Sequence, residues 1–241
     1  MHIPVNIILF DSQEIQTALP LTDVRSVHIT DILKRQIGEE FDVGLLNGPR
    51  GKASIVSQSE AGLNLKFVWG QMPQALDPIT LVIGMPRPQT ARKILSEAAA
   101  LGVKTLYFVS TEKADPSYAM STLWSTGEYK KQIRSGAEQA FCTRLPEVIF
   151  NQSLEEVWNS IDLNTTKIAL DNYESPEALS QAKLSPPCVI AIGSERGWSL
   201  SERNLFRSTN TQLCHLGERV LRTETACVAS VSIIKAALGL M

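Results

Sequence analysis

The hydrophobic and polar positions follow one pattern before about residue 72 and another after it. In the first part, short segments rich in β-forming residues alternate with turn residues, and these segments cover residues 5–10, 39–58 and 63–69. Short strands separated by Gly, Pro, Asn and Asp are typical of a small barrel or a twisted sheet. We therefore expect residues 1–72 to form a small β domain.

A hairpin is indicated inside this β-rich part. Asn47, Gly48 and Pro49 are turn-forming residues that stand between two strand-like runs. Arg50 and Lys52 follow directly, so the pattern places two cations at or near the tip of the hairpin.

After a linker at residues 70–78, predicted strands alternate with predicted helices. Strands are expected at 79–85, 104–110, 167–171 and 188–193, and helices at 89–103, 128–141 and 154–161. Apolar strands without polar alternation, separated by helices, are typical of a parallel sheet covered on both faces. Such sheets bind ligands just past the carboxyl ends of their strands. The sequence thus predicts an α/β domain over residues 73–241.

The composition adds few constraints. A hydrophobic content of 44%, a charged content of 20% and a net charge of −2 are those of an ordinary globular protein, without the basic excess of many nucleic-acid-binding proteins. No apolar run is long enough to span a membrane, and the first residues lack the basic segment of a signal peptide, so a cytoplasmic location is expected. The four cysteines are scattered and the three histidines dispersed, which favours reduced core thiols and no metal site.

The stretch IAIGSERGWSLSERNLF, residues 190–206, is a candidate ligand-binding loop. An apolar strand runs into Gly193, the chain turns as far as Gly197, and Ser199 with Glu202 forms the capping box of a helix. Backbone N–H groups in such a loop can face a ligand. A plain structural turn explains the same spacing, and the missing Lys-Ser/Thr pair disfavours nucleoside triphosphate chemistry.

A second loop precedes the last predicted helix, residues 226–238, which Thr223 or Thr225 would cap. Arg222 stands in front of this helix, where the peptide dipoles already favour negative charge. Either Glu218 or Glu224 neutralises Arg222, or the arginine binds an anionic ligand.

Together these segments resemble a known family. GSERGW at 193–198, LGERVLRTETA at 216–226 and EQAFCTRLP at 138–146 are similar to three signatures of the bacterial small-subunit ribosomal RNA uridine-N3 methyltransferases. These are SPOUT-class enzymes that use S-adenosylmethionine. HITDILKRQIGEEF, residues 28–41, is similar to the RNA-binding PUA-like domain of that family.

The resemblance implies a PUA-like β-barrel at 1–72 and a SPOUT α/β domain with a deep trefoil knot at 73–241. It also implies a homodimer that acts on 16S ribosomal RNA in the small ribosomal subunit. The cofactor-binding residues that it implies are Leu170, Ile192, Gly193, Ser194, Glu195, Gly197, Leu216, Gly217, Val220, Leu221, Arg222 and Thr223. The RNA-binding residues are Lys34, Arg35, Arg50, Lys52, Glu138, Gln139 and Arg144.

The sequence departs from the family pattern in the cofactor loop, in the N-terminal motif and at the start of the second domain, where Arg87 stands near a usual Pro-Lys-Gly and the usual lysine of the following helix is missing. Ser194 replaces a proline and Arg196 a glycine in the cofactor loop, and Lys34 replaces an arginine of the N-terminal motif. They suggest a divergent branch with altered RNA contacts.

The expected chemistry is methyl transfer from a sulfonium to nitrogen, an in-line displacement that needs no metal. Uridine N3 must lose its proton, so a general base and a cationic partner for the ring oxygens are expected. Arg222 is the candidate cation, and Glu195, Glu224 and Glu138 are candidate bases. Each glutamate could equally orient the backbone or an arginine.

Two other hypotheses remain open at this stage. The chain could be a knotted methyltransferase of another RNA position, or a non-catalytic RNA-binding or ribosome-assembly protein whose cofactor loop is spoiled by Arg196.

Overall fold

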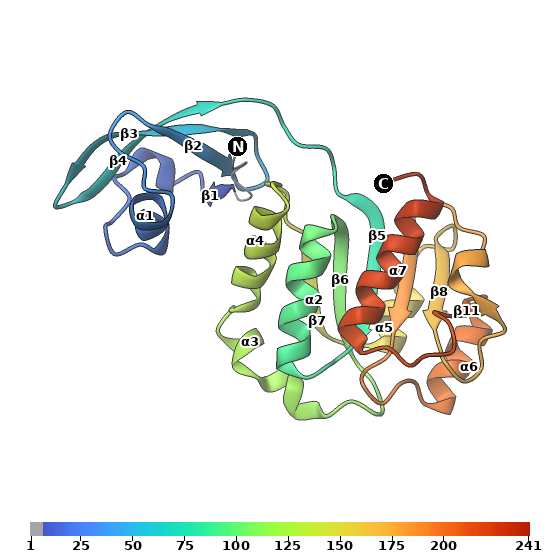
Figure 1. Ribbon diagram of the computed structural model, residues 1–241. Coiled ribbons are helices and arrows are strands. Elements are labelled where there is room, and N and C mark those ends of the chain that lie inside the picture. The colour runs from blue at the N-terminus through green and yellow to red at the C-terminus, as the bar shows by residue number, and fades with distance from the viewer. Residues whose placement is uncertain (1–6) are drawn as a thin grey trace. The chain divides into compact units, whose positions relative to one another are not determined.

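The structure is a computed structural model that describes residues 7–241 (Figure 1). The chain divides into two compact units. The first unit comprises residues 1–75 and 137–145, and the second comprises residues 76–136 and 146–241. Residues 138–145, which carry most of the EQAFCTRLP motif, therefore pack with the N-terminal part of the chain.

The first unit contains a four-stranded sheet in the order β1-β2-β3-β4. Its strands are β1 (Ile8–Phe10), β2 (Glu40–Leu45), β3 (Arg50–Ser59) and β4 (Gly62–Trp69). Three short helical turns lie between β1 and β2, at Glu14–Gln16, α1 (Val24–Val27) and a π-helical turn at His28–Ile32. The predicted hairpin is confirmed, because β2 and β3 pair antiparallel with Asp42 opposite Lys52. Of the predicted first strand, residues 5 and 6 lie outside the described residues.

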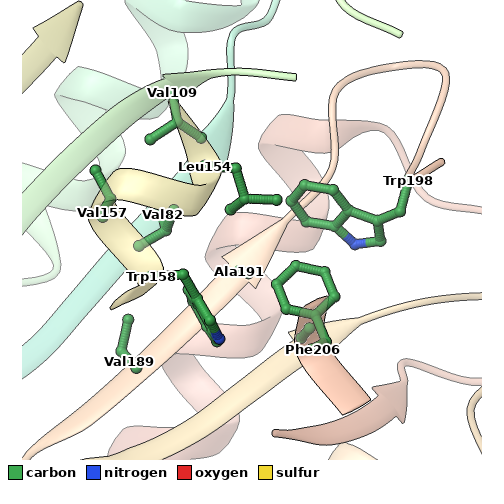
Figure 2. Close-up of a cluster of buried hydrophobic side chains, with 10 residues drawn as sticks. Val82, Val109, Leu154, Val157, Trp158, Val189, Ala191, Trp198 and Phe206 are labelled. Carbon is green, nitrogen blue, oxygen red and sulfur yellow. The ribbon is translucent and has the colours of Figure 1, made fainter. Parts of the chain in front are cut away.

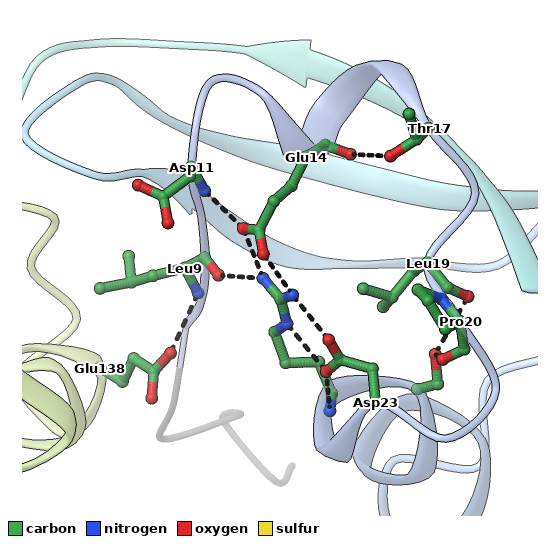
Figure 3. A network of polar contacts seen from close by, with 10 residues as sticks. Leu9, Asp11, Glu14, Thr17, Leu19, Pro20, Asp23 and Glu138 are labelled. Atoms are coloured by element: carbon green, nitrogen blue, oxygen red, sulfur yellow. Dashed lines mark hydrogen bonds and ion pairs between the residues drawn. The ribbon is translucent and has the colours of Figure 1, made fainter. Parts of the chain in front are cut away.

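A buried aromatic and aliphatic cluster holds this sheet to its helical turns. Phe10, Ile29, Phe41 and Leu63 are at most 3% exposed in it. Segment 137–145 adds a second set of contacts: Thr143 Oγ1 donates to the Gly48 carbonyl at 2.5 Å. Glu138 Oε1 accepts from the Leu9 amide at 3.2 Å (Figure 3).

The second unit is built on a fully parallel seven-stranded sheet in the order β7-β6-β5-β10-β8-β11-β9. Its strands are β5 (Asp77–Gly84), β6 (Val103–Ser110), β7 (Glu147–Ser153), β8 (Thr166–Leu170), β9 (Glu177–Ala178), β10 (Cys188–Ile192) and β11 (Gln212–His215). The predicted parallel α/β sheet is confirmed. Strand β10 is apolar along its whole length because it lies between β5 and β8, where all five of its residues are buried.

Helices cover both faces of this sheet (Figure 1). They are α2 (Pro88–Ala100), α3 (Thr122–Ser125), α4 (Tyr129–Gln139), α5 (Leu154–Ser160), α6 (Leu200–Ser208) and α7 (Thr223–Ala237), with shorter turns at Pro116–Met120 and Leu179–Gln181. Helices α2 and α7 pack against each other on one face, and α5 and α6 lie on the other (Figure 1).

An aromatic cluster joins α5, α6 and the sheet (Figure 2). The Phe206 ring lies between two indoles in edge-on geometry, with centroids 5.1 Å from Trp158 and 5.0 Å from Trp198. Trp198 Nε1 donates to the Leu170 carbonyl at 2.8 Å, so this indole ties the end of the 193–198 loop to the end of β8. Fully buried aromatic side chains are among the largest contributors to core stability.

Two local expectations are wrong, and three strands were missed. The linker ends before β5, which includes Pro78; the proline is tolerated because pairing with β6 is irregular between Asp77 and Thr80. Neither Thr223 nor Thr225 caps α7: Arg222 is the N-cap residue, without a side-chain capping bond. Strands β7, β9 and β11 were not expected, because they are short or polar and lie toward the edges of the sheet.

Candidate functional site

A pocket of about 770 Å³ opens in the second unit beyond the carboxyl ends of β8 and β10. The loop 193–198, the segment 216–224 and the start of α7 contribute most of its lining. Ligand pockets in proteins commonly have this volume. The position agrees with the rule that parallel sheets bind ligands past the carboxyl ends of their strands.

The tight 193–198 loop depends on glycine at two positions. A Cβ on Gly193 would lie 3.0 Å from the Gly197 Cα, so the loop could not close on itself unchanged. Gly197 has φ +65°, and its amide donates to the Ser194 carbonyl at 2.9 Å. The predicted capping box follows directly and is confirmed: Ser199 Oγ accepts from the Glu202 amide, and the Glu202 carboxylate accepts from the Ser199 amide.

Most of the cofactor residues expected from the sequence line this one pocket. They are Leu170, Ile192, Gly193, Ser194, Glu195, Gly197, Leu216, Val220, Leu221, Arg222 and Thr223. Gly217 is not part of the lining. A Cβ at Gly217 would meet nothing within 4 Å, and the requirement for glycine there comes from its φ of +101°.

Arg222 has no ion-pair partner among residues 7–241. Glu224 instead pairs with Lys93 on α2, with Nζ 3.0 Å from Oε1. The expected ion pair of Arg222 with Glu218 or Glu224 is therefore absent from the described part of the chain, although the charge of Arg222 acts on Glu224 at longer range. The exposed guanidinium lines the pocket beside the positive end of α7 and is available to an anion.

The two pocket glutamates have different surroundings. Burial raises the pKa of Glu224, but hydrogen bonds from its own amide and Lys93, with the charge of Arg222, outweigh burial and lower it overall. A carboxyl with a lowered pKa is a weaker base. Glu195 is exposed, and its Oε1 accepts from the Arg87 amide at 3.0 Å.

Cations outnumber acids in the pocket. The lysine and arginine side chains of the lining are Arg87, Lys93, Arg196, Arg203, Arg219 and Arg222, and the acids are Asp171, Glu195 and Glu224. Within residues 7–241, only Lys93 and Arg203 of these cations have a carboxylate within 4.0 Å. In a chain of net charge −2, this local excess favours an anionic ligand.

Sequence reasoning missed several lining residues, among them Lys93, Tyr173, Arg203 and Arg219. Tyr173 lies just past the carboxyl end of β8, so the strand-end rule could have found it, whereas Lys93 lies within α2 and gave no such signal. Arg203 gave no local signal, because it reaches the pocket from α6 by pairing with Asp171, 32 positions earlier.

The expected RNA-binding residues lie in the first unit, and several have partners there. Lys52 Nζ pairs with Asp42 at 2.7 Å, Arg50 lies over the Phe141 ring at 5.8 Å, and Arg144 Nε donates to the Pro73 carbonyl at 3.4 Å. Lys34 and Gln139 are exposed, and Arg35 is half-buried. Glu138 binds the Leu9 amide, which is a structural contact within the first unit.

The thiols agree with the expectation of core filling. Cys188, Cys214 and Cys227 are buried and Cys142 is half-buried, all of them free. Burial, with the nearby charge of Glu177, raises the pKa of Cys214 to about 11, so this thiol is protonated at neutral pH.

Within residues 7–241, no cluster of His, Cys, Asp and Glu could hold a metal ion, and no helix is long and apolar enough to cross a membrane.

Two solved structures share this fold. One is a ribosomal RNA small subunit methyltransferase E from Neisseria gonorrhoeae bound to S-adenosylmethionine, with a TM-score of 0.76, 19% identity and coverage of 96% of this chain and 98% of that one. The other is a putative methyltransferase from Legionella pneumophila in complex with the same cofactor, with a TM-score of 0.77, 20% identity and coverage of 96% and 98%.

Two relatives found by sequence have a higher sequence identity to this chain than these two structures do. Ribosomal RNA small subunit methyltransferase E of Treponema pallidum (strain Nichols) is 35% identical over 96% of this chain and 91% of its own length. Ribosomal RNA small subunit methyltransferase E 1 of Borreliella burgdorferi is 29% identical over 96% of this chain and 98% of its own length. A family model described as an RNA methyltransferase domain matches residues 73–235. Because this model matches more than half of the chain and the Treponema pallidum relative is 35% identical, the chain belongs to the RNA methyltransferase family.

Proposed function

We propose that the chain transfers a methyl group from S-adenosylmethionine to N3 of one uridine in the 16S RNA of the small ribosomal subunit. The observation that carries this proposal is the pocket, which joins the GSERGW and LGERVLRT segments and includes Arg222, a cation with no carboxylate of residues 7–241 within ion-pair distance. The 35% identity to ribosomal RNA small subunit methyltransferase E of Treponema pallidum supports the choice of RNA.

The lining residues fit the cofactor. S-adenosylmethionine supplies an electrophilic methyl group on a sulfonium, and it also carries an amino group, a carboxylate and an adenine ring. Buried Ile192 and half-buried Leu170 offer apolar surface for the adenine ring. The acids of the lining can bind the amino group of the cofactor, and the arginines can bind its carboxylate. We assign cofactor binding to nine of the expected residues that line the pocket, all except Glu195 and Arg222, with Gly217 shaping the 216–222 segment through its positive φ.

Arg222 is assigned to the developing negative charge of the uracil. When the N3 proton leaves, charge accumulates on the ring oxygens, and a preorganised cation lowers the cost. Arg222 suits this role because no carboxylate of residues 7–241 lies within ion-pair distance of it. Glu195 is the stronger of the two pocket candidates for general base, since Glu224 is held by Lys93 and its pKa is lowered.

The first unit is assigned to RNA binding as a PUA-like domain, through Lys34, Arg35, Arg50, Lys52, Gln139 and Arg144. We also infer a trefoil knot in the second unit, a homodimer with the active site near its interface, and a cytoplasmic location with the ribosome. The fold likeness to the Neisseria gonorrhoeae structure supports the inference about the fold, and the motifs that the chain shares with the family support the dimer and the location.

The test is methylation of small ribosomal subunits purified from a strain that lacks the modification. Incubation with cofactor should block the Watson–Crick edge of one uridine and stop reverse transcription there. Gly193→Val, in which the branched side chain collides with the Gly197 backbone, is the inactive control. A stop at a different base would assign the enzyme to another RNA position. Cofactor binding without methyl transfer to any RNA would contradict the proposal.

A further inference from the structure

Tyr173 is the most exposed aromatic side chain in the lining of the pocket. It lies just after β8, in the segment DNYES, and 82% of its surface is accessible. Aromatic rings at a pocket mouth offer a large apolar face at low entropic cost, because only two side-chain torsions must be fixed.

The backbone under Tyr173 is held by a buried carboxylate. The Asp171 side chain is 1% exposed, and its Oδ1 accepts from the Tyr173 amide at 2.6 Å and the Glu174 amide at 3.0 Å. Ser175 Oγ closes the turn by donating to the Asp171 carbonyl. The loop is therefore fixed by its own hydrogen bonds.

One face of the Tyr173 ring has a support. The Arg203 guanidinium lies over it, with Cζ 5.6 Å from the ring centroid, a cation–π distance. Arg203 is itself fixed, because its Nε lies 2.5 Å from Asp171 Oδ2 and 3.8 Å from Glu174 Oε1. Glu174 also pairs with Arg207. The ring is backed on one side, and its high exposure leaves the other side to solvent.

We propose that the open face of Tyr173 is a stacking platform for an unpaired nucleobase of the RNA substrate, an inference that rests on the proposed function. RNA-binding proteins read single-stranded and splayed-out bases by stacking them on aromatic rings. Arg196 and Arg219, which have no carboxylate of residues 7–241 within 4.0 Å, add positive charge in the same lining for the flanking phosphates. A base at Tyr173 would share the pocket with the cofactor that donates the methyl group.

The test compares two probes with equal phosphate charge, a short oligouridylate and an abasic strand of the same length. The full-length protein should prefer the strand with bases, and Tyr173→Ala should remove that preference, a loss of about 5- to 150-fold for one stacked base. Tyr173→Phe should keep it, because the ring face remains. Leu163→Ala, at a site 93% exposed and outside the pocket lining, is the control and should match the original protein.

Cofactor affinity, measured by calorimetry, shows whether Tyr173 contacts the RNA base or the cofactor. It should stay within about twofold in Tyr173→Ala, because the proposed partner is the RNA base. If Tyr173→Ala loses cofactor affinity and keeps its preference for bases, the ring contacts the adenine of the cofactor and the inference is wrong. The inference also fails if the original protein shows no preference for bases. Base preference that depends on Tyr173, without methylation of small subunits, would contradict the proposed function alone.

Discussion

Arg25 in the first unit and Arg222 in the second show two opposite uses of an arginine. Arg25 donates to Glu14, to Asp23 and to the Leu9 carbonyl, and its side chain is 14% exposed (Figure 3). Burial lowers the pKa of its guanidinium, but hydrogen bonds and charges from Glu14 and Asp23 outweigh burial and raise it. Arg222 is exposed, and no carboxylate of residues 7–241 lies within ion-pair distance of it.

The difference teaches how to separate structural from functional charge. Where a cation has all its partners within the fold, its charge serves stability, and an added ligand would have to displace them. Where a cation lines a pocket without a partner, its electrostatic energy is available to a ligand or a transition state. Three predictions test this distinction and one tests the backbone of the pocket, from the largest expected effect to the smallest.

Arg222→Ala should reduce turnover by about 10²- to 10³-fold, the usual cost of losing one donor to a developing oxyanion. Cofactor affinity should change far less, because the charge on the uracil exists only during the reaction. Steady-state kinetics on small subunits and calorimetry with S-adenosylmethionine measure the two effects. Equal losses in both would show that Arg222 serves the cofactor.

Arg25→Ala should lower the free energy of unfolding of the first unit by roughly 2–3 kcal/mol, since two carboxylates lose their partner. Lys52→Ala, which removes an ion pair whose lysine is 50% exposed, should cost about 0–1 kcal/mol and serves as the matched control. Hydrogen exchange of the β1–β4 amides in urea reports on this unit. If both variants lowered the free energy of unfolding by similar amounts, the number of partners of a cation would not indicate its role in stability.

Gly193→Ala should weaken cofactor binding by about tenfold, roughly 1.4 kcal/mol, because its Cβ pushes on the Gly197 backbone 3.0 Å away. Gly217→Ala places its Cβ in open space and strains only the backbone, so any loss should come through stability. Calorimetry and thermal unfolding of both variants make the comparison. A larger loss of cofactor affinity in Gly217→Ala would mean that the 216–222 segment, more than the 193–198 loop, determines cofactor binding.

Glu224→Gln should leave turnover within about fivefold of the original, below the 10²- to 10⁴-fold expected for loss of a general base. The folded pKa of Glu224 is lowered, so the carboxylate stays charged above its ordinary pKa, and any stability it adds is lost only as the pH falls through the lowered value. Glu224 therefore contributes no slope to the pH–rate profile between pH 5 and 8. Loss of an ionisation from that profile in the variant would restore Glu224 as the base.

Much of the second unit could be predicted because its local signals are strong. Five consecutive apolar residues in β10 require burial on both faces, and Ser199 with Glu202 marks the start of α6. The strand-end rule then placed the 193–198 loop at a ligand site, and the resemblance added the 216–226 segment. Both lie in one pocket.

The start of α7 shows where local reasoning fails. The sequence predicted a helix from Ala226 with Thr223 or Thr225 as its cap, yet the helix begins three residues earlier, at Thr223, with Arg222 as N-cap. The capping preference is worth about 1 kcal/mol, and the packing of Thr223, Cys227 and Val231 in the interior outweighs it.

By itself, the sequence determined the parallel α/β class, the hairpin of the first unit and the two segments that form the pocket, because burial and turn chemistry depend on residues close together in the chain. Only the tertiary structure decided that β10 lies between β5 and β8, that residues 137–145 pack with the first unit, and that Glu224 pairs with Lys93, 131 positions away. Strand pairing uses backbone groups that are alike at every residue, and an ion pair forms with whichever charge the fold brings near. Among residues 7–241 Arg222 has no ion-pair partner for the same reason, because the fold pairs Glu224 with Lys93.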